Sequence, residues 1–147
     1  MDFSFTDEQQ ELKRQARSWL GERYPLDRDW ETEEHAWPEL AELGWLGVSV
    51  AEENGGAGLG FVEEAILLEE TGYALYPGPY LATVGLALPW LGPEQQARVA
   101  TGDERWSVEV NGLVPWLGTV DLVVADGSAY PARGDEERTV DPTRLLG

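Results

Sequence analysis

Residues that start and stop helices divide the first 105 residues of this 147-residue chain into short segments, and this division constrains the fold most strongly. Thr6 and Gln9 match a capping box, in which the two side chains bind free backbone N–H groups at a helix start. Proline favours the first turn of a helix, and glycine favours its end. Together with apolar residues at helical spacing, these signals predict helices at residues 7–22, 38–44, 61–73, 80–91 and 93–100.

The pattern changes after residue 105. Residues 106–110 alternate between apolar and polar side chains, and residues 120–125 form a short β-prone run. A few strands are only marginally stable unless they pack on another element. We therefore predict a mainly α fold, with a bundle-like N-terminal helical domain of about five helices at residues 1–105 and a few short β-strands at residues 106–147.

The chain is strongly acidic, with 28 Asp and Glu residues against 10 Lys and Arg residues and a formal net charge of −18. Nucleic acid phosphates would be repelled by such a surface, and so would an anionic membrane surface, which argues against both as partners. Two interpretations of the acidity stay open. It forms either a solvated shell that aids solubility or a face that docks a basic partner subunit.

The sequence contains no cysteine, which excludes disulfides, thiolate catalysis and cysteine-based zinc sites. The only histidine, His35, lies beside a predicted helix start, and we expect a surface or capping residue rather than a catalytic one. One histidine and scattered acids do not make a ligand set, so we predict no metal site.

The N-terminal 20 residues contain no basic region followed by an apolar core, so they do not match a secretory signal. The longest apolar stretch, residues 79–92, contains Pro89 and is shorter than the about 20 residues that a membrane-spanning helix needs. We therefore predict no membrane insertion and a cytoplasmic location.

Four glycines fall within the six residues Gly55–Gly60. Such a segment can adopt positive φ angles and turn tightly. It lacks the Gly-Lys-Ser/Thr ending of a phosphate loop, and Gly58-Leu59-Gly60 alone is a weak dinucleotide-binding signal. We prefer the interpretation as a tight turn between two helices.

Two pairs of acids, Glu63-Glu64 and Glu69-Glu70, lie on the predicted helix at residues 61–73. Paired carboxylates can perform acid–base chemistry when a partner group is near. No such partner is evident in the sequence, so we expect these four side chains to face solvent.

At the glycine-rich turn the sequence resembles the acyl-CoA dehydrogenase family. Residues Trp37–Val48 and Glu52–Gly58 resemble the family's helix ending in Leu-Gly-apolar-Leu-Gly, followed by Pro-Glu-Glu-Tyr-Gly-Gly-x-Gly. The opening Phe3–Gln9, the pair Glu69-Glu70 and the segment Gly92–Gln96 resemble further family motifs in the same order. The resemblance covers residues 1 to about 105, although Ala51 replaces the usual proline and Asn54 the usual aromatic residue.

The resemblance implies a helical N-terminal domain that supplies part of the acyl cavity wall, followed by a shortened piece of the family's middle β domain. In the family, flavin adenine dinucleotide (FAD) lies between the middle domain and a C-terminal four-helix bundle. A glutamate of the C-terminal region removes the α-proton of the acyl-CoA, and a hydride passes from the β-carbon to the flavin. The resemblance therefore implies an FAD-dependent oxidoreductase acting on an acyl-CoA thioester.

Trp116, Leu117 and Gly118 are the candidate cofactor-binding residues, because they resemble the family's Trp-Ile-Thr/Ser strand that borders the flavin. Gly118 replaces the hydroxyl residue of that strand, so its hydrogen bond to the flavin would be lost. Trp116 has an alternative role as a core tryptophan. The family's Thr-Glu-Pro-x-Ala-Gly-Ser-Asp loop, which holds flavin and substrate, has no counterpart in this sequence.

No catalytic residue is assigned, because the region that carries the family's catalytic base has no counterpart in the chain. We therefore expect the chain to be inactive alone and to form a homo- or hetero-oligomer with a subunit that supplies the bundle. The alternative is a non-catalytic helical interaction module, or a degenerate subunit of a heteromeric acyl-CoA dehydrogenase.

Overall fold

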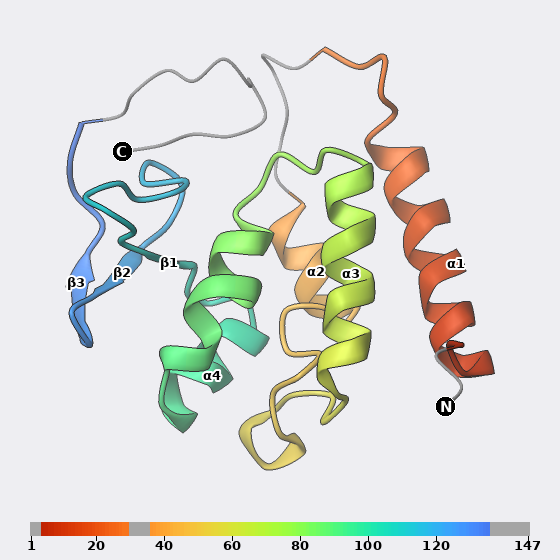
Figure 1. The fold of residues 1–147 in the computed structure, drawn as a ribbon, viewed down its shortest axis with the longest axis horizontal. Coiled ribbons are helices and arrows are strands. Elements are labelled where there is room, and N and C mark those ends of the chain that lie inside the picture. Colours follow the sequence, from red (N-terminus) through yellow and green to blue (C-terminus); the bar gives the residue numbers. More distant parts are fainter. Residues whose placement is uncertain (1–3, 30–35, 136–147) are drawn as a thin grey trace.

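The computed structural model describes residues 4–29 and 36–135, and it confirms the predicted mainly α fold followed by short strands (Figure 1). His35 lies outside the described residues, so its predicted surface role stays a prediction. The helices are α1 (Asp7–Arg23), α2 (Trp37–Glu42), α3 (Phe61–Tyr73), a fourth helical segment formed by η2 (Leu81–Ala87) and η3 (Leu88–Trp90), and α4 (Pro93–Ala100), with a short 3₁₀ turn η1 (Glu52–Asn54) before α3. The predicted bounds 61–73 and 93–100 coincide with α3 and α4.

Local hydrogen bonds explain where the helices begin. The Gln9 backbone N–H donates to the Thr6 hydroxyl at 3.2 Å, and the Thr6 N–H donates to Gln9 Oε1 at 3.0 Å, which confirms the capping box. At the start of α3, the Gly60 N–H donates to Glu63 Oε2 at 3.0 Å. In both helices, the start is therefore fixed by a hydrogen bond between a backbone N–H group and a side chain three residues away in the sequence.

The predicted helix at residues 80–91 is not a regular α-helix. Its first part, η2, is a π-helical segment that ends with an N–H of Leu88 donating to the Thr83 carbonyl five residues earlier. The η3 turn that follows contains Pro89, which has no N–H to continue an α-helical ladder. A Cβ at Gly85 would lie 3.0–3.4 Å from Leu81 and Leu68 side-chain atoms, so the small residue lets η2 approach α3 closely.

The glycine-rich segment forms the predicted tight turn. It folds back on residues 47–50 through three backbone hydrogen bonds, from Ala57 N to Gly47 O, Gly58 N to Val50 O and Leu59 N to Val48 O, at 2.8–3.0 Å. A Cβ at Gly56 would lie only 2.1 Å from the Val50 carbonyl oxygen, so no larger residue fits there without movement.

A large hydrophobic core joins the helices. α1 lies along α3, and η2 runs back beside α3 in the opposite direction (Figure 1). Trp45, Leu46 and Val48 are buried. Trp45 packs edge-on against Trp19 of α1, with ring centroids 5.4 Å apart. The residues of this core are Ala16, Leu20, Tyr24, Trp37, Leu40, Trp45, Leu46, Val48, Val50, Leu67, Ala74, Tyr76, Tyr80, Val84, Ala87, Leu88, Val99 and Trp106.

The three strands form one small sheet. β1 (Trp106–Val108) pairs in parallel with β2 (Leu122–Ala125), and β2 pairs antiparallel with β3 (Ser128–Pro131). A two-residue turn at Asp126-Gly127, with φ angles of 48° and 73°, joins β2 to β3, and such positive angles match the twist of a hairpin. Unlike β1 and β2, β3 was not predicted from the sequence, because its four residues are all exposed.

The sheet is tied to the helices through Thr83 of η2, which is fully buried. Its hydroxyl donates to the Trp106 carbonyl at 2.7 Å and accepts from the Trp106 N–H at 3.1 Å. Both backbone groups of the first strand residue are therefore satisfied by one helical side chain. β1 begins immediately after the predicted domain boundary at residue 105 and packs directly on η2. The boundary itself stays a prediction.

Candidate functional site

Trp116, Leu117 and Gly118 lie in a turn between β1 and β2, not in a strand. The backbone N–H groups of Thr119 and Val120 donate to the Trp116 carbonyl oxygen at 2.9 and 3.1 Å. Trp116 has a φ of 56°, a left-handed conformation that is uncommon for a bulky residue. The likeness of these three residues to a flavin-bordering strand therefore does not extend to their backbone conformation.

The three residues also have different surroundings. Trp116 and Leu117 are buried in a second, smaller hydrophobic cluster, whereas Gly118 is exposed. The indole N–H of Trp116 donates to the carbonyl oxygen of Pro77, at 3.0 Å, and thereby links the turn to the chain after α3. This burial agrees with the core role that the sequence allowed for Trp116, and the flavin contact of the three residues stays a prediction.

Trp116 lines a cavity of about 170 Å³ between the C-terminal half of α3 and the start of η2. Complete ligand pockets usually measure about 300–1,000 Å³, so this cavity can hold only part of a ligand. Its lining mixes apolar and polar side chains and contains no acidic side chain. The lining residues are Leu68, Thr71, Gly72, Leu75, Tyr76, Gly78, Tyr80, Leu81 and Trp116.

Sequence reasoning named Trp116 but missed the other lining residues. They come from α3, from the connection after it and from η2, and no single periodic pattern contains them. The one usable signal was the break at Pro77-Gly78-Pro79, which ends the α3 segment and lets the chain run back beside it (Figure 1).

The prediction that all four acids of α3 face solvent is wrong for two of them. Glu70 is 1% exposed and Glu64 is 6% exposed, whereas Glu69 is exposed and Glu63 is half-buried. Glu64 accepts a hydrogen bond from the Ser49 hydroxyl. Glu64 and Glu70 lie on different sides of α3: Glu64 faces Ser49, and Glu70 faces α1, so each buried carboxylate has a polar partner from another segment.

Two basic residues of α1 neutralise Glu70. The ammonium of Lys13 lies 3.0 Å from Glu70 Oε1, and the Arg17 guanidinium donates to both carboxylate oxygens. Burial acts to raise the pKa of Glu70, but the hydrogen bonds from Arg17 and Lys13 outweigh it and hold the pKa below its usual value. Lys13 also bridges to Glu69 at 2.8 Å, and hydrogen bonds to Glu69 and Glu70 raise the pKa of Lys13.

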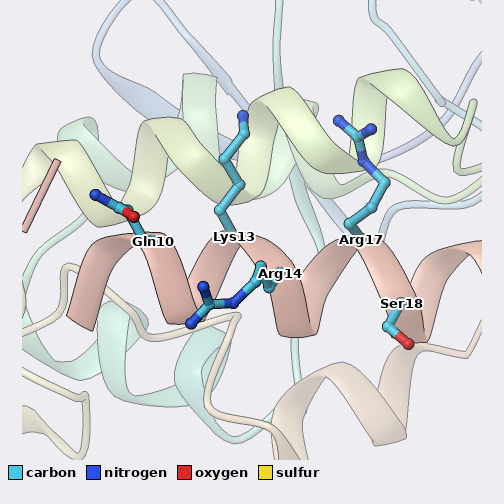
Figure 2. A pocket seen from close by; sticks show the side chains of 5 residues that line it. All are labelled: Gln10, Lys13, Arg14, Arg17 and Ser18. Atoms are coloured by element: carbon cyan, nitrogen blue, oxygen red, sulfur yellow. The ribbon is translucent and has the colours of Figure 1, made fainter. Parts of the chain in front are cut away.

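Further contacts align α1 with α3. Gln9 Nε2 donates to Glu63 Oε1 at 2.8 Å, and the Arg17 guanidinium carbon lies 3.6 Å from the centre of the Tyr73 ring. Figure 2 shows Lys13 and Arg17 extending from α1 toward α3. A hollow of about 520 Å³ along α1 is lined by Gln10, Lys13, Arg14, Arg17 and Ser18.

Among the described residues, the charged side chains between α1 and α3 hold the two helices together and form no binding or catalytic site. The charges of Lys13, Arg14 and Arg17 are compensated by Glu11, Glu69 and Glu70, so the hollow presents no excess charge for an anion. Glu70 is held ionised by its partners and does not face the cavity behind α3. Within residues 4–29 and 36–135, no group of three His, Cys, Asp or Glu side chains could hold a metal ion. Over the same ranges, no helix is long and apolar enough to cross a membrane.

The structure is thus a helical N-terminal domain followed by short strands. The model of the family described as "Acyl-CoA dehydrogenase, N-terminal domain" matches residues 6–99. The chain therefore belongs to the acyl-CoA dehydrogenase family, which confirms the resemblance found in the sequence.

A curated relative supports this membership, and solved structures share the fold. Acyl-CoA dehydrogenase FadE12 of Mycobacterium tuberculosis is 39% identical over 157 aligned residues, which cover 97% of this chain and 36% of FadE12. The ChsE4–ChsE5 complex of M. tuberculosis shares the fold with a TM-score of 0.66 at 23% identity, over 88% of this chain and 47% of that chain. An acyl-CoA dehydrogenase of Bacillus anthracis, solved with FAD, gives a TM-score of 0.65 at 19% identity, over 97% and 35% of the two chains. This chain thus spans about a third of the length of FadE12.

Proposed function

We propose that this chain is the N-terminal part of a flavin-dependent acyl-CoA dehydrogenase, which removes hydrogen from the α and β carbons of an acyl-CoA thioester. Residues 1–105 act as the helical domain, and residues 106–147 act as a shortened piece of the middle β domain. The observation that carries the proposal is the cavity between α3 and η2, within a chain that belongs to the family. In this proposal the cavity supplies part of the wall around the acyl group.

The three predicted cofactor residues do not fit a flavin site by themselves. The indole N–H of Trp116 is already bonded to Pro77, the Leu117 side chain is buried, and Gly118 has no side chain to donate a hydrogen bond. We therefore assign no step of the reaction to these residues. We propose FAD and a base that removes the α-proton only because the chain belongs to the family. In this proposal another part of the assembled enzyme binds the FAD and carries the base.

A bulky side chain in the cavity should weaken acyl-CoA binding. Gly72 lines the cavity, and a Cβ at this position has no atom within 4 Å. Gly72→Leu should fold normally, because leucine favours helix, while it fills space that the acyl chain needs. We expect at least a roughly tenfold loss of affinity for hexanoyl-CoA by calorimetry, equivalent to about 1.4 kcal/mol.

Gly21→Leu is the matched control, because Gly21 lies in α1, away from this cavity, and also has open space around its Cβ position. It should bind hexanoyl-CoA as the unchanged chain does. If Gly72→Leu binds hexanoyl-CoA with unchanged affinity, the cavity is not part of the acyl wall.

The alternative is a non-catalytic interaction module or a degenerate subunit. It is favoured by the poor flavin fit of Trp116–Gly118 and by large exposed apolar side chains such as Phe61 and Trp90, which are 74% and 73% exposed. A partner subunit would cover such side chains. ChsE4 and ChsE5 form a complex, so an assembly of two different chains has a precedent in this fold.

The absorbance spectrum of the purified chain separates the two proposals. We expect no flavin bands and no acyl-CoA-dependent reduction of an electron acceptor by the chain alone. Co-expression with the products of neighbouring genes should give a yellow complex that has both properties. Flavin in the chain alone would overturn our expectation of inactivity, and a colourless complex would favour the non-catalytic module.

A further inference from the structure

Within the described part of the chain, Tyr76 is the one polar residue of the cavity wall whose polar atom has no hydrogen-bond partner. Its side chain is 5% exposed, and its hydroxyl oxygen is buried without a hydrogen-bond partner among the described residues. The other polar wall residues are satisfied: the Thr71 hydroxyl donates to Leu68 O at 3.0 Å, and the Tyr80 hydroxyl donates to Trp45 O at 2.9 Å. The indole of Trp116 is also satisfied, by its bond to Pro77.

A buried hydroxyl without a partner destabilises a free protein, because it loses its bonds to water and receives none in return. Phenylalanine would fill the same space without this cost. Burial also raises the pKa of Tyr76 well above its usual value, so the phenol stays protonated at neutral pH. The side chain is therefore a hydrogen-bond donor that needs an acceptor oxygen.

The hydroxyl lies against Gly78, which lines the same cavity. A Cβ at Gly78 would lie 2.4 Å from the Tyr76 hydroxyl oxygen, so any larger residue would displace the phenol. Next in the chain, Pro77 accepts the bond from Trp116. Tyr76, Gly78 and Trp116 all line the cavity, so the hydroxyl lies in the part of the wall that these residues form.

We propose that Tyr76 is a specificity-determining residue, whose hydroxyl donates a hydrogen bond to a keto oxygen carried on the acyl chain of the ligand. The inference rests on the proposed acyl-CoA function and names its substrate class. A purely aliphatic chain leaves the hydroxyl unsatisfied when it fills the cavity, whereas an oxo-acyl chain supplies the acceptor. A site built to bond an oxygen discriminates strongly against an analogue that lacks it.

The test compares hexanoyl-CoA with 5-oxohexanoyl-CoA by calorimetry on the 147-residue chain. We expect the unchanged chain to bind the oxo compound about tenfold more tightly, since one hydrogen bond contributes about that factor. Tyr76→Phe should bind both compounds equally, with the affinity for hexanoyl-CoA preserved. Its melting temperature without ligand should equal or exceed that of the unchanged chain. Tyr73→Phe, which alters an exposed tyrosine outside the cavity wall, should keep the tenfold preference.

Three results would overturn the assignment while leaving the proposed function intact. They are equal binding of the two compounds by the unchanged chain, equal weakening of both by Tyr76→Phe, and a lower melting temperature of that variant. If the unchanged chain binds neither thioester, it does not form an acyl site by itself, and 2-heptanone observed by NMR then tests Tyr76 alone. Ketone binding that Tyr76→Phe abolishes supports the inference, and absence of ketone binding overturns it.

Discussion

Gly56→Ala is expected to lower the free energy of unfolding by about 3 kcal/mol, because the new methyl group has no space. Its Cβ would lie 2.1 Å from the Val50 carbonyl oxygen and 2.4 Å from Val50 Cβ. The same carbonyl accepts the Gly58 N–H at 2.8 Å, so moving it also weakens a backbone bond that closes the turn. Urea unfolding followed by tryptophan fluorescence measures the change.

Gly21→Ala is the control for this prediction. Gly21 lies inside α1, and no atom comes within 4 Å of its Cβ position. Alanine there should stabilise the chain by about 0.5–1 kcal/mol, because it loses less backbone freedom on folding. Equal stability of Gly56→Ala and the unchanged chain would show that the turn rearranges easily and does not require glycine.

Glu70→Gln is expected to cost about 3 kcal/mol at pH 7. The carboxylate is 1% exposed and binds both Lys13 and Arg17. Its neutral replacement leaves Arg17 without its anion and Lys13 with Glu69 alone. Removing one partner of a buried ion pair costs about 3–5 kcal/mol, and the partial exposure of Lys13 and Arg17 places this case at the lower end. Chemical unfolding at pH 7 measures the loss.

The effect of Glu70→Gln should also depend on pH. The pKa of Glu70 is lowered in the folded chain, so its stabilisation is complete above the unfolded value of about 4.3. It disappears as the pH falls through the folded pKa, and the two proteins should then become equally stable. Glu69→Gln, at a 60% exposed side chain, should change stability by less than about 0.5 kcal/mol. A difference between Glu70→Gln and the unchanged chain that persists at pH 2 would show that packing, not charge, holds α1 to α3.

The helix limits could be predicted because the signals that set them are local. The bond between Thr6 and Gln9 and the start of α4 at Pro93 involve residues within one turn of each other. The π-helical geometry of η2 was not predictable, because it accompanies the close packing of Gly85 on Leu68, a residue distant in sequence. β3 was missed for a related reason: all its side chains are exposed, so no apolar alternation marks it.

The candidate site divides in the same way. Trp116 was identified through its sequence context, but its left-handed turn depends on hydrogen bonds within the folded β region. The burial of Glu70 was predicted wrongly, because an acidic pair on a helix gives no sign that Lys13 and Arg17 approach from another helix. The unpartnered hydroxyl of Tyr76 has no sequence signal at all.

The sequence by itself determined the family, the mainly α fold, the helix starts and the tight glycine turn. These features depend on residue types at short, fixed spacing, which local hydrogen bonding and steric limits translate directly into structure. The tertiary structure alone decided which acids are buried, where the cavity lies and which polar group in its wall lacks a partner. Those features depend on contacts between α1, α3, η2 and the turn at Trp116, and such contacts exist only after segments distant in sequence have packed together.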